Sequence, residues 1–293
     1  MPNLGPSVIG SSMQQDLIDM TAIGNAIVDV LARVEDADLE RHGMPKGGME
    51  LIDAGRADTL YAELKDAQEV SGGSVANTAV GVTSFGGSAA YIGKVASDSL
   101  GESFSASIRE AGVRYGTEPT ADGPGTGRCI VFVTGDAQRT LNTYLGACVE
   151  LGPEDIDRDL VARSRVTYLE GYLFDPPRAR EAFSDAAVVA RAAGRKVSLS
   201  LSDTFCVQRH AEAFREFVAQ HVDILFANEE EIFALCDTRD LATAVDRVRG
   251  QVEVAALTRG EKGALIVKGS EIFEIPARPV ASVVDTTGAG DLF

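Results

Sequence analysis

Apolar and polar residues alternate in blocks along the second half of the chain. Residues 166–171 and 196–202 are short apolar runs typical of buried strands. Residues 176–194, between them, have helical spacing with proline at the start and glycine at the end. Strands that alternate with helices predict a mostly parallel sheet with helices on both faces. The other predicted strands are residues 18–24, 89–93, 222–228 and 252–260, with a terminal hairpin over residues 264–276.

Two extended segments interrupt this order, residues 29–51 and residues 128–144. Both are expected to be hairpin-like, and the second should turn at Gly135 and Asp136. A helix is predicted between them, over residues 56–67. Two insertions into one sheet most simply meet as a small lid over its edge.

The predicted fold class is therefore α/β, with a mostly parallel central sheet and a small β-rich lid. The large domain would comprise residues 18–29, 68–117 and 149–293. The lid would comprise residues 30–67 and 118–148. Residues 1–17 would form a frayed N-terminal extension.

The composition limits the class of partner. The formal charge of −17 argues against a nucleic-acid partner, although backbone amides and a metal ion can still bind a small anion. The sequence contains no apolar run of 18 residues that would span a membrane, and it does not start like a secretory signal. Four scattered cysteines without a CxxC pair indicate reduced thiols. We therefore expect a cytoplasmic protein that binds a small molecule.

Four glycine-containing turns stand at or near the ends of predicted elements. They are GN at 24–25, SGG at 71–73, TRG at 258–260 and DTTGAGD at 285–291. Ligands of open α/β sheets bind outside the carboxyl ends of the strands. We therefore expect these turns to converge on one site.

The motif DTTGAGD suggests chemistry on a phosphate. Gly288, Ala289 and Gly290 have little or no side chain, so their N–H groups can converge on an anion. Asp291 follows directly, and its carboxylate could take the proton of an alcohol beside that phosphate. A tight turn capped by aspartates is the alternative for Gly-Ala-Gly alone, whereas the seven residues together favour a catalytic role.

The chain resembles the ribokinase-like (PfkB-type) carbohydrate and nucleoside kinases. DTTGAGD is close to the second signature of that family, and SGGSVANTAVGVTSFGG at 71–87 is similar to the first. Order and spacing also match, and the resemblance covers nearly the whole chain from Ile18 onward. It implies a three-layer αβα fold and phosphoryl transfer from ATP, with Mg²⁺, to a hydroxyl group of a sugar or nucleoside. Asp291 would be the base, and Gly288 to Gly290 the anion hole.

The resemblance also implies which residues would bind the acceptor. Asp29 corresponds to the family's aspartate that binds sugar hydroxyls, and its two acceptor oxygens suit a vicinal diol. Gly72 and Gly73 would let the substrate approach the backbone. Asn77 lies four residues beyond Gly73 on the same helix face, so both residues can contact one ligand.

On the nucleotide side, Asn228 and Glu231 match the family's Asn-x-x-Glu, which orders Mg²⁺ and its waters near the phosphates. Helix capping by Asn228 is a competing role, because this residue stands where a strand meets a helix, and both roles can hold. Thr258, Arg259 and Gly260 resemble the loop beside the ATP phosphates.

Arg139, in the predicted lid, aligns with an arginine of nucleoside-kinase members that reaches over the transferring phosphate. It would supply its charge only when the lid closes. Dependence on K⁺ stays open, as does the choice between a monomer and a homodimer.

Adenosine is the acceptor we favour, which would make the reaction the phosphorylation of its 5′-hydroxyl to AMP, a step of purine salvage. The predicted lid contains a helix-sized segment, as nucleoside kinases of the family do. Leu141 and Phe174 could sandwich a purine between an aliphatic cap and an aromatic face, although most buried Leu and Phe residues are ordinary core.

Other functions remain to be weighed. A kinase for ribose or fructose is the main rival, an inosine-guanosine kinase is a third enzyme, and a regulator that binds nucleosides without turnover belongs to another class. Members of the family continue beyond the terminal motif, so a further segment is expected after Phe293.

Overall fold

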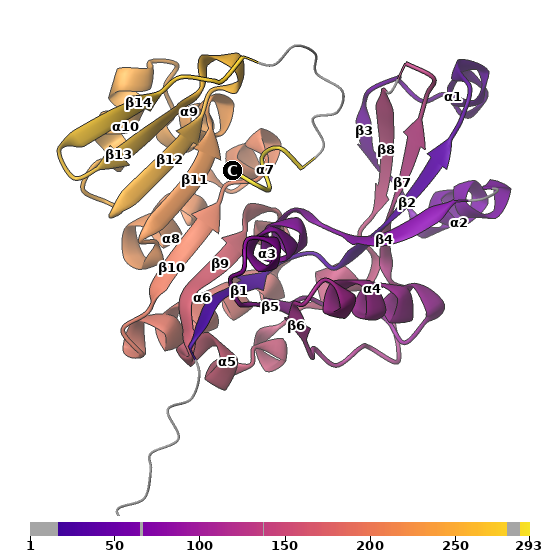
Figure 1. Cartoon of the computed structure of the whole chain (residues 1–293), viewed down its shortest axis with the longest axis horizontal. Helices are drawn as coiled ribbons and strands as arrows, with labels where there is room; N and C mark the ends of the chain where they lie inside the picture. The colour runs from indigo at the N-terminus through magenta and orange to yellow at the C-terminus, as the bar shows by residue number, and fades with distance from the viewer. Residues whose placement is uncertain (1–16, 65–66, 137, 280–287) are drawn as a thin grey trace, which may run out of the picture.

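A nine-stranded sheet forms the centre of the computed structural model, which describes residues 17–64, 67–136, 138–279 and 288–293. All neighbouring strands of this sheet between its edge strand β6 (Arg114–Tyr115) and β12 (Val254–Thr258) are parallel. Strands β13 (Ala264–Lys268) and β14 (Glu271–Ile275) add an antiparallel hairpin at the opposite edge (Figure 1). The mostly parallel sheet and its terminal hairpin are therefore confirmed. The strand order is β14 (Glu271–Ile275), β13 (Ala264–Lys268), β12 (Val254–Thr258), β11 (Ile224–Asn228), β10 (Lys196–Ser200), β9 (Ser164–Glu170), β1 (Ile18–Ile23), β5 (Ala89–Ile92) and β6 (Arg114–Tyr115).

Helices pack on both faces of this sheet, because its central strands bury side chains on both sides; every residue of β5, for example, is buried. On one face lie α6 (Pro177–Ala192), α8 (Ala211–His221) and α9 (Glu229–Cys236). On the other, α3 (Ser74–Ser84) packs on β1 and β5, with α4 (Ser99–Glu110) next to β6. Further helices of this part of the chain are α5 (Arg158–Ala162), α7 (Thr204–Arg209) and α10 (Leu241–Val248). No helix in the described ranges has the length and apolar character needed to cross a membrane.

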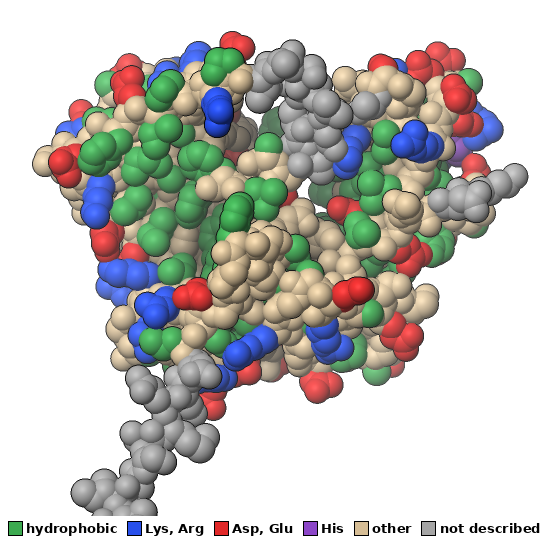
Figure 2. Space-filling view, in the orientation of Figure 1, with side chains coloured by type: hydrophobic (Ala, Val, Ile, Leu, Met, Phe, Trp, Pro, Cys, Tyr) green, Lys and Arg blue, Asp and Glu red, His purple; other side chains and the backbone are tan. Residues whose placement is uncertain are grey.

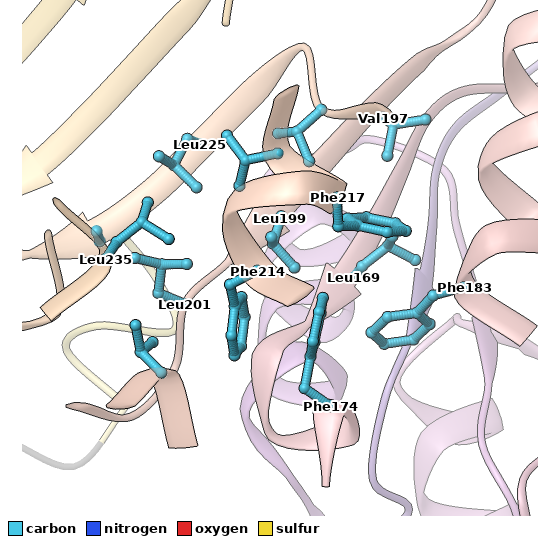
Figure 3. Close-up of a cluster of buried hydrophobic side chains, with 14 of the residues drawn as sticks. Leu169, Phe174, Phe183, Val197, Leu199, Leu201, Phe214, Phe217, Leu225 and Leu235 are labelled. Atoms are coloured by element: carbon cyan, nitrogen blue, oxygen red, sulfur yellow. The ribbon is translucent and has the colours of Figure 1, made fainter. Parts of the chain in front are cut away.

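Aromatic rings fill the core beneath α6 and α8 (Figure 3). The ring of Phe174 lies 3.7 Å from that of Phe214, centroid to centroid, and the two are nearly parallel. Edge contacts to Phe183 and Phe217 surround the same ring, which is 2% exposed. The prediction that Phe174 contacts a purine is therefore wrong. Its 3₁₀ turn (η3, Gly171–Phe174) directs the ring into the core, where the alternative interpretation had placed it.

A second, five-stranded sheet has the order β3 (Met49–Leu51), β8 (Arg139–Tyr144), β7 (Gly127–Val133), β2 (Ile27–Arg33) and β4 (Gln68–Gly72). Strands β7 and β8 form the antiparallel hairpin predicted for residues 128–144, so that prediction is confirmed. The helix predicted over residues 56–67 is observed as α2, Ala54–Glu63.

The prediction of a hairpin-like segment over residues 29–51 is wrong. Strand β2 pairs with β4 and β7, whereas β3 pairs with β8, and α1 (Asp36–His42) separates β2 from β3. Sequence signals for α1 were present. Glu35 and Asp38 form a capping box, and Gly43 ends the helix in the left-handed conformation at φ 66°.

The two sheets meet where β1 leads into β2 and where β4 leads into α3. Ile27 of β2 pairs with Gly72 at the end of β4. Gly73 follows with φ 98°, and a Cβ on it would lie 2.3 Å from the carbonyl oxygen of Asn25. Only glycine allows this approach, which holds the start of α3 against the β1–β2 loop. The predicted N-terminal extension lies outside the described residues, apart from Leu17.

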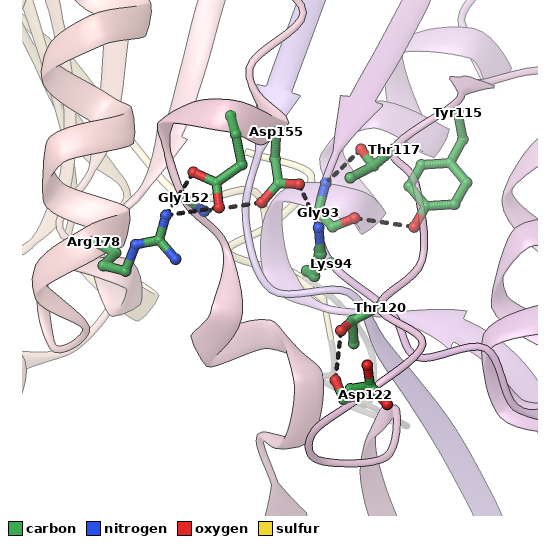
Figure 4. Close-up of polar contacts among 10 residues, drawn as sticks. Gly93, Lys94, Tyr115, Thr117, Thr120, Asp122, Gly152, Asp155 and Arg178 are labelled. Carbon is green, nitrogen blue, oxygen red and sulfur yellow. Dashed lines mark hydrogen bonds and ion pairs between the residues drawn. The ribbon is translucent and has the colours of Figure 1, made fainter.

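Polar contacts fix the loop after β5 to the segment before α6 (Figure 4). Lys94 forms an ion pair with Asp155 in η2 (Pro153–Asp155), and both side chains are largely buried. Asp155 also accepts the Gly152 N–H at 2.9 Å, and the Tyr115 hydroxyl donates to the Gly93 carbonyl at 3.0 Å. A charge pair that is satisfied in this way specifies one position for the loop.

We predict that Phe174→Ala lowers the free energy of unfolding by about 3–5 kcal/mol, because it opens a cavity among three packed rings. Urea denaturation followed by circular dichroism measures this change. Phe205→Ala is the matched control: Phe205 is 69% exposed, so its loss should change stability by roughly 0.5 kcal/mol or less. Equal effects of the two substitutions would contradict the core assignment.

Candidate active site

Helix α3 holds Asp291 through three hydrogen bonds. The Ser74 hydroxyl donates to Oδ1 of Asp291 at 2.8 Å, and the Asn77 amide donates to Oδ2 at 2.9 Å. The Thr78 hydroxyl donates to the main-chain carbonyl of Asp291 at 2.7 Å. Ser74, Asn77 and Thr78 are three and four residues apart, so they share one face of the helix. Asn77, predicted to bind the acceptor, therefore contacts the predicted base directly.

The predicted anion hole forms a turn in front of α3. Gly288 has φ 72°, and its carbonyl accepts the Leu292 N–H at 3.0 Å. A Cβ on Gly290 would meet no atom within 4 Å, so this backbone faces open space. Residues 285–287 of the motif lie outside the described residues.

Apolar contacts anchor this turn against β11 and α3. A cavity of about 560 Å³ lies beside the turn, and hydrophobic side chains gather over the neighbouring strands (Figure 2). Phe293 meets Phe226 of β11 edge to face, with 6.5 Å between ring centroids. The Leu292 side chain fills the space over Gly81 of α3, where a Cβ would lie 2.6 Å from it. Gly81 thus lets the turn lie close to the helix.

Asp29 approaches the same place from β2, in the small sheet. A Cβ on Gly72 would lie 2.4 Å from the carboxyl carbon of Asp29, so the glycine leaves room for this carboxylate. Burial, reinforced by the negative charge of Asp291, raises the pKa of Asp29 to about 6, and the Arg139 guanidinium acts against this rise. The charges of Asp29, Asp291 and Arg139 therefore act within one region, although they come from separate parts of the sequence.

The small sheet presents an apolar face around Asp29. Ile27 and Leu31 flank Asp29 at two-residue spacing, so all three side chains lie on one face of β2. Leu141 of β8, half-buried, lies opposite Val131 of β7 and packs into the same apolar cluster. Sequence reasoning identified Leu141 but missed the other three apolar residues. The alternation of side chains along β2 and β7 was the signal that could have identified them.

Three of the predicted nucleotide and metal residues line a cavity that Asp291 also borders. Asn228, Glu231 and Thr258 border this space of about 120 Å³ together with Gly290 and Asp291. Asn228 and Thr258 are neighbours in register at the ends of β11 and β12. The carboxyl ends of parallel strands thus place these side chains together, as expected for this sheet type.

Asn228 and Glu231 also cap α9, as the alternative interpretation predicted. The Asn228 side-chain oxygen accepts the Glu231 N–H at 2.8 Å, and Glu231 accepts from the backbone and the amide of Asn228 at 2.9 and 2.7 Å. Burial is the main reason that the pKa of Glu231 is raised. Both carboxylate oxygens already have donors, so Glu231 suits water-mediated contact with a cation better than direct ligation. Within the described residues, no three His, Cys, Asp or Glu side chains are placed to hold a metal ion directly.

Gly260 and Arg259 follow β12 in the predicted nucleotide loop. Gly260 borders an apolar cavity of about 400 Å³, which Ile275, Pro276 and Ala289 also line. The Arg259 guanidinium lies 3.6 Å from the Glu229 carboxylate at the start of α9, so its charge is directed toward that helix. The geometry therefore brings Gly260, more than the Arg259 side chain, to the cavity beside the turn.

Four residues of this region were missed by the sequence analysis. Ser74 and Thr78 contact Asp291 directly. Tyr168 is buried and lines the same cavity as Asp291, and burial raises its pKa to about 12. Glu170, at the end of β9, is 1% exposed and lies within electrostatic range of Asp291. A charged residue that ends an apolar strand was the available signal for Glu170.

Comparison with known proteins places this geometry in a family. Residues 49–293 match the family model of the pfkB family carbohydrate kinases. The chain is 51% identical to the adenosine kinase of Sinorhizobium meliloti, with a TM-score of 0.85 over 94% of this chain and 84% of that chain. It is 49% identical to a probable sugar kinase protein from Rhizobium etli CFN 42, with the same TM-score and the same two coverages. It is also 27% identical to the adenosine kinase of Saccharomyces cerevisiae, over 94% of this chain and 86% of the relative.

These similarities confirm the ribokinase-like α/β fold, and they show that the protein is a phosphotransferase that acts on a hydroxyl group. The family implies ATP as the cosubstrate and, typically, Mg²⁺. The chain belongs to the pfkB family of carbohydrate kinases.

Proposed function

We propose that the protein transfers the γ-phosphoryl group of ATP to the 5′-hydroxyl of a nucleoside, with adenosine as the preferred acceptor. The observation that carries this proposal is that the start of α3 holds Asp291 through Ser74 and Asn77, while the Asp29 carboxylate lies against Gly72, two residues before Ser74. One carboxylate can bind ribose hydroxyls while the other, held by Ser74 and Asn77, takes a proton. Similarity to the adenosine kinases of S. meliloti and S. cerevisiae supports the choice of acceptor.

In the reaction we propose, the 5′-oxygen attacks the γ-phosphorus and its proton passes to Asp291. The bond from the γ-phosphorus to the bridging oxygen breaks, and ADP leaves with that electron pair. The N–H groups of Gly288, Ala289 and Gly290 would stabilise the charge that develops on the phosphoryl oxygens. Arg139 would add positive charge from the small sheet, which we propose acts as a lid. Besides strands within residues 30–67 and 118–148, this sheet contains β4 (Gln68–Gly72) and the start of β2 at Ile27.

The apolar face around Asp29 favours a nucleoside over a bare sugar. Ile27, Leu31 and Leu141 would pack against a flat base, and burying that apolar area favours binding. A sugar alone would leave the same face in contact with water. The similarity to the probable sugar kinase from R. etli nevertheless supports a sugar kinase as the second candidate.

ATP would lie along the ends of β11 and β12. The cavity bordered by Thr258 and Gly260 has the apolar lining that an adenine ring requires. Asn228 and Glu231 are the residues we expect to hold the waters of Mg²⁺. When bound, the ion would neutralise phosphate charge.

We predict that adenosine has the highest kcat/KM among adenosine, inosine, guanosine, ribose and fructose, assayed with ATP and Mg²⁺. The apolar area that only a nucleoside buries on the small sheet is the reason to expect the nucleosides above the sugars, and similarity to the adenosine kinases of S. meliloti and S. cerevisiae supports adenosine as the first of them. A coupled ADP assay measures this ranking. Efficient turnover of ribose or fructose with adenosine inert would overturn the proposed acceptor and favour the sugar kinase.

Asp291→Asn should lower kcat by roughly 10²- to 10⁴-fold, because the amide cannot accept the hydroxyl proton. Adenosine binding, measured by isothermal titration calorimetry, should change little, since Asp29 and the apolar face remain. Asp246→Asn, at an exposed carboxylate of α10, is the control and should behave as wild type. Undiminished turnover by the Asp291 variant would remove this residue from the role of base.

The raised pKa of Asp29, about 6, predicts an acid limb in the pH profile of kcat/KM for the acceptor. Above pH 6 the carboxylate is ionised and accepts hydrogen bonds from two hydroxyls; below it the proton removes one acceptor. Asp29→Asn should abolish this limb and lower kcat/KM roughly 100-fold or more, since each hydrogen bond to a charged group is worth about 1.5–3 kcal/mol. Initial rates between pH 5 and 9 measure the profile, and a limb that persists near pH 6 in the variant would contradict the assignment.

A further inference from the structure

Glu170 is a buried carboxylate to which the proposed reaction assigns no step. It ends β9, beneath the junction of the two sheets, and is 1% exposed. Its two oxygens accept backbone N–H groups from two different segments: Oε2 accepts from Asn25 at 2.7 Å, and Oε1 lies 3.4 Å from the Val75 nitrogen.

The two segments that meet on Glu170 carry the two sides of the site. Asn25 belongs to the loop that leads into β2 and so to Asp29. Val75 belongs to the first turn of α3, which holds Asp291 through Ser74. A small displacement at Glu170 would therefore change how Asp29 is placed relative to Asp291.

Glycines allow this convergence. A Cβ on Gly24 would lie 3.0 Å from Oε2 of Glu170 and 2.3 Å from the Val75 side chain. A Cβ on Gly73 would collide with the Asn25 carbonyl at 2.3 Å. The backbone is thus packed around the carboxylate so closely that the loop and the helix share it.

An ionisable group is a costly choice for packing alone, because a buried carboxylate loses its hydration. Burial is the main cause that raises the pKa of Glu170 to about 7, and the charge of Asp291 acts in the same direction. The N–H groups of Asn25 and Val75 oppose this rise by stabilising the ionised form.

The other titratable groups around Glu170 come from several elements. Within the described residues they are Asp291, Tyr91 of β5, Tyr168 of β9, Tyr172 of η3 and Cys148 of η1 (Gly146–Glu150). Burial raises the pKa of the three tyrosines and of Cys148, so these four groups stay neutral across the physiological range.

We propose that Glu170 is a positioning residue for phosphoryl transfer: its ionised carboxylate accepts both N–H groups and thereby fixes the loop that carries Asp29 against the helix that holds Asp291. This proposal rests on the function proposed above for those two aspartates. A protonated Glu170 has a hydroxyl in place of one acceptor, so one of the two segments loses its partner. Turnover should then decline as the pH falls through about 7, above the limb assigned to Asp29.

The test is Glu170→Gln, assayed between pH 5 and 9 with ATP, Mg²⁺ and the acceptor that the wild type uses best. Gln keeps the shape but presents one acceptor and one donor. At pH 8 we expect kcat to fall roughly 10- to 100-fold, because small misplacements of reacting groups have effects of that size. The KM for ATP should change little. The limb near pH 7 should disappear, whereas the limb near pH 6 should remain.

Two control measurements separate the role of Glu170 from a general effect on the fold. Tyr91→Phe removes a buried hydroxyl from the same region without touching either N–H group, and it should retain the wild-type pH profile. Thermal unfolding at pH 8 separates positioning from a structural role: the Gln variant should be at least as stable as wild type, because a buried charge is removed. A wild-type kcat and an intact limb near pH 7 would overturn the proposal, and so would a loss of stability that parallels the loss of activity.

The same assays separate an error in the proposed acceptor from an error in the role of Glu170. If the wild type prefers a sugar to every nucleoside, the proposed acceptor fails, but the pH profile of Glu170→Gln can still be measured with that sugar. If adenosine is the acceptor and the limb near pH 7 persists in the variant, the inference fails alone.

Discussion

The arrangement of this kinase depends on the contact between one helix and one short turn. Ser74, Asn77 and Thr78 of α3 hold both the carboxylate and the carbonyl of Asp291, over 210 residues away in sequence. Each hydrogen bond is modest alone, but together they fix the position and rotation of the proposed base. The turn has few other anchors within the described residues, chiefly Leu292 over Gly81 and Phe293 against Phe226. Without α3, the proposed base would have no defined relation to Asp29.

The helix itself is placed by glycines and by a buried acid. Gly73 allows α3 to start against the β1–β2 loop, and Glu170 accepts N–H groups from both. As a result, the carboxylates of Asp29 and Glu170 are buried near Asp291, where they lose hydration. The pKa values of Asp29 and Glu170 rise from 3.8 and 4.5 to about 6 and about 7. The folded state therefore binds more protons than the unfolded chain between about pH 4 and 7, so these groups favour the folded state less as the pH rises through that window. The ionised carboxylates therefore lower the stability of the folded state at neutral pH, where they serve as hydrogen-bond acceptors in the site.

Much of the fold and part of the site could be predicted from the sequence, because local patterns of residues determine them. The alternation of strands and helices gave the parallel sheet, and its topology explains why Asn228 and Thr258 meet at the strand ends. Predictions failed where tertiary context decides. Phe174 has an aromatic ring that could stack on a purine, but η3 directs this ring onto the ring of Phe214. The segment after Asp29 has extended character, yet α1 intervenes and β3 pairs with β8. Ser74 and Thr78 are ordinary small helix residues, and only the position of the distant turn gives them a role.

A crystal structure of the protein with adenosine and an unreactive ATP analogue would locate the acceptor hydroxyl. We predict the 5′-oxygen of adenosine within roughly 2.6–3.2 Å of an Asp291 oxygen, with the ribose hydroxyls on Asp29 and the γ-phosphate analogue at Gly288 to Gly290. An acceptor hydroxyl that lies on another carboxylate, with Asp291 still bound only to Ser74 and Asn77, would contradict this prediction.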